Sequence, residues 1–246
     1  MQIQGSVALV TGANRGLGKA FAEALLARGA AKVYAGTRNP PAEGSTGGDS
    51  RLVPVRLDVT SAADISAAAT RCPDVTLLIN NAGILLMSSM LKEGSDDILR
   101  KEMEVNVFGM LGMTRAFAPI LGKNGGGAIV NMLSVVSWFT VPFTATYCAS
   151  KHAALVVSDA SRIELRRQKT QVVGVYAGYI DTDMATSVDQ PKTPASQIAD
   201  RALDGVEKRL DHVLADARSE EVWKQTRENP TQLAKLQQLA WETRPK

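Results

Sequence analysis

The sequence predicts an α/β fold, a doubly wound parallel sheet of about seven strands with helices on both faces. Short apolar runs alternate with longer amphipathic stretches, and right-handed crossovers assemble this βαβ order into a parallel sheet. The runs are almost continuously apolar, which is typical of parallel strands covered on both faces. Six such runs occupy residues 6–10, 32–36, 52–57, 76–80, 128–132 and 172–176.

The stretches between these runs place apolar residues at three- and four-residue spacing, which predicts helices over residues 17–28, 62–71, 95–121 and 147–169. Residues 39–50 are rich in Gly, Pro and Ser and predict a surface loop, and residues 124–127 predict a glycine-rich turn. Toward the carboxyl end we expect a helix over 196–210, a seventh strand over 211–215 and a helix over 220–241 interrupted near Pro230. No repeat or linker divides the 246 residues, so we expect one domain over 1–246.

Composition and charge exclude several classes of function. Hydrophobic residues make up 45% and charged residues 22%, as in ordinary globular proteins. The net charge of +3 is small and the basic residues are scattered, so we expect no nucleic-acid or membrane partner. No apolar stretch reaches the roughly 18 residues of a membrane span, and the polar first residues predict no signal peptide. Cys72 and Cys148 lack metal-ligand spacing and suit a reducing, cytoplasmic location without a metal site.

A glycine-rich turn separates the first predicted strand from the first helix. Its sequence is Thr11-Gly12-Ala13-Asn14-Arg15-Gly16-Leu17-Gly18. Glycines let the backbone approach a pyrophosphate, and the exposed amides at a helix start point toward its negative charge. A sharp turn without a ligand is the alternative, but the flanking strand and helix favour a dinucleotide site. Its expected contacts are Gly12, Asn14, Arg15, Gly16, Leu17 and Gly18.

The end of the second predicted strand bears on which dinucleotide binds. A carboxylate there would accept hydrogen bonds from the ribose of NAD(H), whereas this chain has Thr37 and Arg38 without a neighbouring acid. The guanidinium of Arg38 is suited to a 2′-phosphate, and Arg15 could approach the same group. We therefore expect NADP(H) rather than NAD(H), the alternative being that Arg38 is simply exposed to solvent.

Two later strand ends add expected cofactor contacts. Asp58 could accept a hydrogen bond from the adenine amino group while Val59 packs on the ring; the alternative role of Asp58 is to cap the next helix, which Ser61 could do instead. The small residues that follow the fourth strand let the backbone approach the adenosine ribose, and an asparagine there can tie adjacent strand ends together. These residues are Asn81, Ala82 and Gly83.

A proton-transfer unit is predicted on the helix over 147–169. Tyr147 and Lys151 are four residues apart and therefore share one helix face. A free tyrosine titrates near 10, too high for an effective acid at neutral pH. A neighbouring ammonium and a cationic nicotinamide would favour the phenolate and lower that pKa. Ser134, at the end of the fifth strand, could donate to a substrate carbonyl and stabilise the charge that develops there.

These motifs together resemble the short-chain dehydrogenase/reductase family, over about the first 185 residues. The matching residues are 11–18, Asp58, 80–83, Asn106, Ser134, Tyr147 and Lys151. The resemblance implies a Rossmann-type fold, an NADP(H)-preferring carbonyl reductase, and catalysis by Asn106, Ser134, Tyr147 and Lys151. In it Tyr147 is the general acid or base, Lys151 also binds the nicotinamide ribose, and Asn106 holds a water that relays protons.

The chain departs from the family pattern after the sixth strand. Ala177 stands where the family has proline, so we expect a looser loop, although Ile180 and Thr182 should still reach the nicotinamide carboxamide. The usual long substrate lid and glycine-rich last strand are missing, so the family's common tetramer contact is not expected. The resemblance still implies a homodimer through the helices over 95–121 and 147–169.

The segments expected around the nicotinamide are apolar, namely residues 84–87, 135–136, 138–139, 141–143 and Tyr179. They predict a hydrophobic ketone, aldehyde or secondary alcohol as substrate, with ordinary core packing as the alternative for half of them. Two rival functions remain. A dinucleotide-sensing regulatory protein would be expected to lose Ser134, Tyr147 or Lys151, and a nucleotide-sugar epimerase or dehydratase would need a larger domain after the sixth strand.

Overall fold

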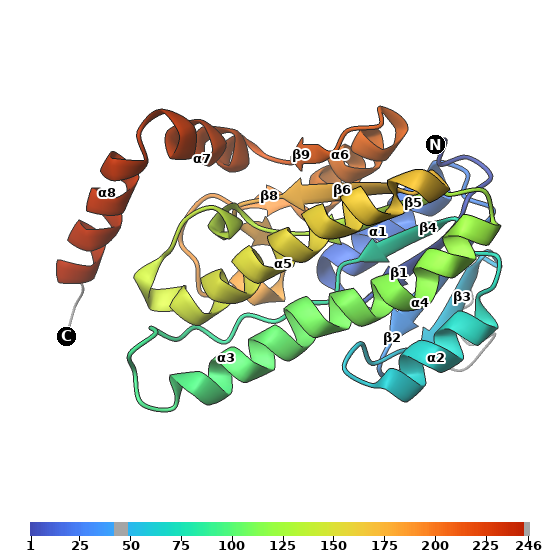
Figure 1. Cartoon of the computed structure of the whole chain (residues 1–246), viewed down its shortest axis with the longest axis horizontal. Coiled ribbons are helices and arrows are strands. Elements are labelled where there is room, and N and C mark those ends of the chain that lie inside the picture. Colours follow the sequence, from blue (N-terminus) through green and yellow to red (C-terminus); the bar gives the residue numbers. More distant parts are fainter. Residues whose placement is uncertain (42–48, 244–246) are drawn as a thin grey trace.

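The computed structural model describes residues 1–41 and 49–243, and it has the predicted doubly wound α/β architecture (Figure 1). In this part of the chain seven parallel strands form one sheet, in the order β3-β2-β1-β4-β5-β6-β9. The chain runs outward from β1 to β3 and then restarts at β4 on the other side of β1, so the switch point of the topology, where open α/β sheets bind ligands, lies at the carboxyl ends of β1 and β4. The strands are β1 (Val7–Thr11), β2 (Lys32–Thr37), β3 (Leu52–Arg56), β4 (Leu77–Asn80), β5 (Ala128–Met132), β6 (Gln171–Tyr176) and β9 (His212–Leu214).

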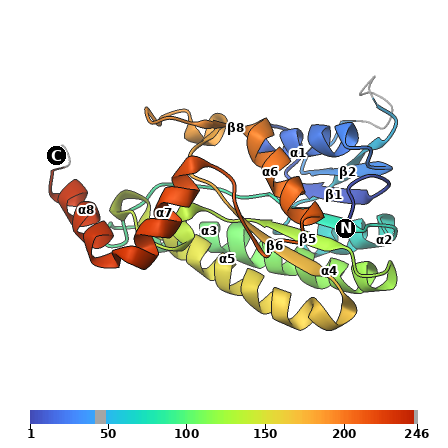
Figure 2. The same cartoon turned by 90° about the horizontal axis from the view of Figure 1, so that it is seen from above.

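Helices cover both faces of the sheet (Figure 2). On one face lie α1 (Gly16–Ala27) and α6 (Ala195–Glu207); on the other lie α2 (Ala62–Arg71), α4 (Met110–Lys123) and α5 (Ala145–Glu164). Helix α3 (Ser95–Met103) leads into α4 and packs beside α5. The last two helices, α7 (Ala217–Glu228) and α8 (Pro230–Glu242), form an arm whose α8 extends away from the sheet (Figures 1 and 2).

The core is divided between the two faces because side chains alternate along each strand. In β1, Ala8 and Val10 pack with Phe21 of α1, whereas Leu9 packs with Phe117 of α4 on the opposite side. All five side chains are fully buried. Burying a large apolar side chain contributes about 1.5–3 kcal/mol, so the two clusters fix the sheet between its helix layers.

The helix predicted over 95–121 differs from expectation in two ways. It runs without a break from Ser95 to Lys123, but residues Glu104–Gly109 form a π-helical turn. Its 29 residues are also long and apolar enough, by length and composition, to cross a membrane, so the expectation that no stretch of this kind exists was wrong. Met113 and Phe117 are nevertheless fully buried against the sheet, so the apolar face of this helix is core surface.

Other boundaries shift by a few residues. Helix α5 begins at Ala145, and its last turn, Leu165–Gln168, is a 3-10 helix. A short parallel pair, β7 (Ile180–Asp181) and β8 (Thr193–Pro194), was not expected. The predicted break between the last helices falls at Asn229, with Pro230 in the first turn of α8. Of the loop predicted over 39–50, residues 42–48 lie outside the described residues.

Candidate active site

The predicted site residues gather at the carboxyl ends of β1, β4, β5 and β6, neighbouring strands of the sheet. The glycine turn follows β1, Asn81 follows β4, Ser134 follows β5, and the loop with Thr182 follows β6. Tyr147 and Lys151 reach this edge from the first turns of α5. The parallel arrangement therefore brings the nucleotide motif and the proposed chemistry to one side of the sheet.

The glycine turn has the shape expected of a phosphate cradle. Gly12 and Gly16 have positive φ values of 68° and 52°, a conformation that side-chain-bearing residues rarely adopt. A Cβ at Gly12 would lie 3.3 Å from the Cα of Ala82, and one at Gly18 would overlap the carbonyl of Gly12. Only residues without a side chain let these segments approach so closely.

The N-terminus of α1 is open to an anion. Arg15 occupies the capping position, but no side chain caps the helix, and its first turn contains no acidic residue. The amides of the first turn lack intrahelical partners, and the helix dipole favours negative charge there. Asn14 and Arg15 are exposed, whereas Leu17 packs against the core and anchors the turn.

The end of β4 is tied to the end of β1, as predicted for an asparagine there. The side-chain Nδ2 of Asn81 donates to the carbonyl of Thr11 at 2.9 Å, and the hydroxyl of Thr11 accepts from the backbone amides of Asn81 and Ala82, each at 2.9 Å. Gly83 follows, and a Cβ there would lie 3.1 Å from Oδ1 of Asn106. These contacts fix the backbone of the segment predicted to bind the adenosine ribose.

The two arginines predicted near the 2′-phosphate have different surroundings. Arg38 is exposed directly after Thr37, the buried last residue of β2. Arg15 instead forms an ion pair with Asp183, with Nη1 2.7 Å from Oδ2 and both side chains about 70% exposed. This partner was not predicted from the sequence, because Asp183 lies far along the chain. The pair lies between the glycine turn and the loop after β6.

Asp58 is engaged locally. Its Oδ1 accepts hydrogen bonds from the backbone amide and the hydroxyl of Thr60, at 2.9 and 2.7 Å. These bonds, and to a lesser degree the charge of Arg38, hold the pKa of Asp58 below its usual value. Ser61 caps α2 through the amide of Asp64, so Asp58 is not needed as the cap. Val59 is buried, and a Cβ at Gly109 would lie 2.8 Å from it.

The three residues predicted to handle the proton and the substrate oxygen lie together. Ser134 is buried after β5, Lys151 is buried in α5, and Tyr147 is partly buried one turn before Lys151. The Nζ of Lys151 lies 5.7 Å from the ring centroid of Tyr147 and donates to the carbonyl of Met132 at 2.9 Å. Burial lowers the pKa of the Lys151 ammonium to about 8.

The pKa of Tyr147 in the protein alone lies above its usual value, whereas the expected lowering included the charge of a bound nicotinamide. Burial raises it well above the usual value, the charges of Cys148 and Glu102 add to the rise, and a hydrogen bond with Ser134 opposes it. Lys151 is not among the groups that shift this pKa, and its ammonium donates to the carbonyl of Met132 rather than to the phenol. The protein alone therefore favours a protonated Tyr147.

Asn106 lies in the π-helical turn and is almost fully buried. Its Oδ1 accepts from the amide of Ile84, and its Nδ2 donates to the carbonyl of Ile84, both at 2.9 Å. Nδ2 also donates to the hydroxyl of Ser150 at 3.0 Å, which donates in turn to the carbonyl of Tyr147 at 2.8 Å. Asn106 thus links the segment after β4 to the helix that carries Tyr147 and Lys151.

The loop after β6, for which we expected a looser backbone at Ala177, is held at Gly178 by the start of the carboxyl-terminal arm. The amide of Gly178 donates to Oδ2 of Asp216 at 2.8 Å, and Asp216 is the N-cap of α7. Ile180 lies in β7, and Thr182 lies against the glycine turn, since a Cβ at Gly16 would be 3.2 Å from its Cγ2.

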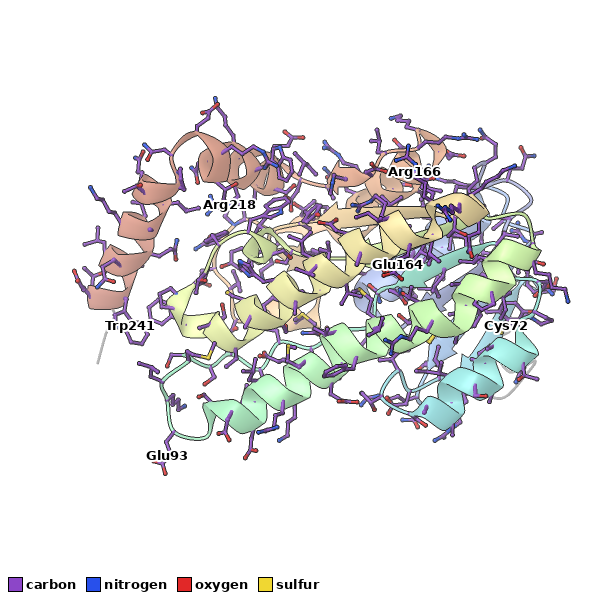
Figure 3. All side chains as sticks on the ribbon, in the orientation of Figure 1. Cys72, Glu93, Glu164, Arg166, Arg218 and Trp241 are labelled. Atoms are coloured by element: carbon purple, nitrogen blue, oxygen red, sulfur yellow. The ribbon has the colours of Figure 1, made fainter. Side chains whose placement is uncertain are left out.

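The arm also lies against the apolar segments expected to contact substrate. Val222 of α7 is fully buried in a cluster with Val135, Val136, Trp138, Phe139, Val141, Tyr147 and Cys148. The Trp223 ring lies 4.8 Å from the Trp138 ring, centroid to centroid. Trp241, which Figure 3 labels near the end of α8, has its ring centroid 5.5 Å from that of Phe143. This role of the arm was not predicted; the available signal was the large apolar pair Val222 and Trp223 in the otherwise polar sequence of α7.

Residue Glu102 was also missed. It is fully buried on α3, and its Oε1 accepts from the amide of Leu86 at 2.8 Å. Its position four residues before Asn106 puts both on one helix face, which is the signal that could have identified it. Among the described residues, no group of three or more His, Cys, Asp or Glu is arranged to hold a metal ion.

Comparison with known proteins agrees with this arrangement. A short-chain dehydrogenase from Burkholderia cenocepacia, solved in complex with NADP, is 43% identical and superposes with a TM-score of 0.89 over 95% of this chain and 97% of that one. The 2,5-dichloro-2,5-cyclohexadiene-1,4-diol dehydrogenase of Sphingobium indicum is 32% identical over 80% of this chain and 82% of its own length. Mouse dehydrogenase/reductase SDR family member 7B is 32% identical over 75% of this chain, which covers 61% of that protein. The short chain dehydrogenase family model matches residues 6–193, and the chain belongs to this family of oxidoreductases.

Proposed function

We propose that the protein is an NADP(H)-dependent carbonyl reductase, which transfers a hydride between nicotinamide and a hydrophobic ketone, aldehyde or secondary alcohol. One observation carries the proposal. Ser134, Tyr147 and Lys151 lie together at the same sheet edge as a glycine cradle that opens onto an uncapped helix N-terminus. That combination supplies a proton donor, a hydrogen bond for the substrate oxygen and a site for a dinucleotide.

The residues present fit the cofactor. The close approaches at Gly12, Gly16 and Gly18 leave backbone amides facing an anion site. Each part of the cofactor then has a group of residues to hold it. The pyrophosphate would lie on Gly12, Asn14, Arg15, Gly16, Leu17 and Gly18, the 2′-phosphate on Thr37 and Arg38, the adenine on Asp58 and Val59, the adenosine ribose on Asn81, Ala82 and Gly83, the nicotinamide ribose on Tyr147 and Lys151, and the carboxamide on Ile180 and Thr182.

Side chains of the protein supply the proton and bind the substrate oxygen. When bound, the nicotinamide donates or accepts the hydride, and its oxidised form adds positive charge near the phenol. Tyr147 holds the proton that the substrate oxygen receives during reduction and takes it back during oxidation. Ser134 donates a hydrogen bond to the same oxygen. Lys151, with a pKa lowered to about 8, remains mostly cationic at pH 7, and Asn106 fixes the helix turn beside it.

Arg38 is the basis for preferring NADP(H) over NAD(H). It is exposed at the end of β2, where a guanidinium can bind a 2′-phosphate through two hydrogen bonds. We expect Arg38→Asp to weaken NADPH binding about tenfold or more and to favour NADH. Arg115→Asp, the same charge change on the exposed surface of α4, is the control. Unchanged selectivity in titrations of NADPH and NADH would contradict this role of Arg38.

The substrate proposal rests on the cluster around Tyr147. Val135, Val136 and Phe139 pack beside Tyr147, and Tyr179 is exposed on the loop after β6. Such surroundings favour an apolar carbonyl compound over a charged one. The test follows NADPH oxidation with a panel of aryl ketones, aldehydes and cyclic ketones. Turnover of the larger apolar members is expected, whereas tight NADPH binding without turnover would favour a dinucleotide sensor and refute the enzyme proposal.

A homodimer through α4 and α5 and a cytoplasmic location complete the proposal. Val156 and Ile163 of α5, and Phe108 of the π-helical turn that precedes α4, are more than half exposed, and large apolar side chains at a surface favour burial against a second copy. Cys72 and Cys148 are both free thiols, which suits a reducing compartment. Light scattering of the purified protein and cell fractionation are the respective measurements.

A further inference from the structure

Glu102 is a buried carboxylate that the proposed chemistry does not yet use. It has no exposed surface, and only one of its oxygens is satisfied, by the amide of Leu86. The other oxygen, Oε2, is enclosed and has no hydrogen-bond partner. A buried polar atom without a partner is costly to a fold, so its presence calls for a compensating role.

Glu102 first helps to hold the backbone of a neighbouring segment in place. Residues 84–88, here named the strap, leave β4 and cross between α3 and the start of α5. Three points hold the strap, each through its backbone. The amide and carbonyl of Ile84 bond to Asn106, the amide of Leu86 bonds to Glu102, and the carbonyl of Ser88 accepts from the amide and hydroxyl of Thr146.

The strap is held in a conformation that it would not adopt unaided. Met87, between the second and third anchors, has a φ of 56°, in the left-handed region that a methionine disfavours. The side chains of Leu86 and Met87 are about half exposed. The last anchor, Thr146, directly precedes Tyr147 in α5. Glu102 thus helps fix apolar side chains in a strained segment that ends beside the proposed acid.

The second consequence is electrostatic. The titratable groups that act on Tyr147 from the elements around it are Glu102 of α3 and Cys148 of α5, while Lys151 lies over its ring and Ser134 bonds to it from the end of β5. Glu102 opposes ionisation of both Tyr147 and Cys148. Its effect on Tyr147 is opposite to that of a cation, because a negative charge nearby favours the neutral phenol.

We propose that Glu102 is a positioning residue: from the side of α3, which packs beside α5, its carboxylate holds the strap through Leu86 and so fixes the segment that ends beside Tyr147. This inference rests on the proposed oxidoreductase function.

The test compares Glu102→Gln, which retains an oxygen for the Leu86 amide but removes the charge, with Glu102→Met, which removes both. Glu104→Gln is the matched control, because Glu104 is exposed two residues along the same helix. The pH dependence of kcat/KM is measured for oxidation of a secondary alcohol with saturating NADP⁺, and amide exchange is measured at Leu86. Thermal melts confirm that each variant folds.

We expect both Glu102 variants to shift the rising limb of the profile to lower pH by about half a unit or more, making oxidation about threefold faster below the midpoint. Only Glu102→Met should raise KM and speed exchange at Leu86. An unshifted limb in Glu102→Gln would overturn the electrostatic role, and equal exchange in the two variants would overturn the strap role. If the wild type oxidises no alcohol and reduces no carbonyl, the proposed function fails instead, and the exchange measurement still decides the strap role.

Discussion

Removing the carboxylate of Asp216 should weaken both the arm and the loop after β6. Asp216 is almost fully buried; its Oδ1 accepts from the amide of Ser219 at 2.7 Å, and its Oδ2 accepts from the amide of Gly178 at 2.8 Å. Loss of an N-cap costs about 0.5–2 kcal/mol, and an unsatisfied buried amide costs about 1–3 kcal/mol. Allowing for water reaching part of the site, we expect Asp216→Ala to lower the free energy of unfolding by about 2–4 kcal/mol.

For a chain of this length that loss corresponds to a fall in Tm of about 4–8 °C. Differential scanning fluorimetry measures the fall, and limited proteolysis shows whether cleavage begins within α7 and α8. Asp216→Asn retains an oxygen for the helix cap and loses the acceptor for Gly178, so about half the effect is expected. Asp189→Ala, at an exposed acidic position, is the control.

Because Gly178 precedes the residues proposed to contact the nicotinamide, Asp216→Ala should also weaken NADPH binding. The direction follows from the anchor: a loop that is no longer held must be ordered when the cofactor binds. An unchanged Tm together with unchanged proteolysis would refute the inference that Asp216 couples the arm to the site.

Three further predictions concern charge and assembly. Lys151 should deprotonate near pH 8 in the folded protein but near pH 10.5 in the unfolded chain, so the unfolded state binds more protons between these values. The free energy of unfolding of the wild type, relative to that of Lys151→Met, should therefore rise by about 3 kcal/mol over this range in urea titrations. A difference that does not change with pH would contradict the burial of the Lys151 charge. Asp183→Asn should release Arg15 from its ion pair and tighten NADPH binding by up to about fivefold in fluorescence titrations, since exposed ion pairs contribute at most about 1 kcal/mol. Weaker NADPH binding would argue against competition between Asp183 and the cofactor for Arg15. Ile163→Glu should convert a dimer into monomers by light scattering, and a persistent dimer would place the interface elsewhere.

The sheet could be predicted from sequence because parallel strands need apolar residues on both faces. All seven expected strands are present, including the one over 211–215, seen as β9 at His212–Leu214. The π-helical turn could not be predicted, since Glu104–Gly109 keeps the apolar spacing of an ordinary helix while adding one residue to a turn. The pair of β7 and β8 was missed because two residues carry no periodicity.

The site was predictable where spacing alone places side chains together. Tyr147 and Lys151 share a helix face by their separation, and the glycines after β1 occupy strained or crowded backbone positions. The pKa of Tyr147 was not predictable, because it depends on burial and on Glu102, which comes from another helix. The ion pair of Arg15 with Asp183 was not predictable either, because Asp183 lies in a distant loop, so only the phosphate was expected as a partner of Arg15.

Replacing Tyr147 by phenylalanine tests most directly whether this side chain transfers the proton. With NADPH and an apolar ketone that the wild type reduces, Tyr147→Phe should lower kcat by about 10²–10⁴-fold, the usual contribution of a positioned general acid. The Tm should stay near the wild-type value, and NADPH should still bind, with the loss limited to the single contact of Tyr147 with the nicotinamide ribose. Tyr179→Phe, a change to an exposed tyrosine on the loop after β6, should retain most activity. Wild-type turnover by a folded Tyr147→Phe protein would mean that another group supplies the proton.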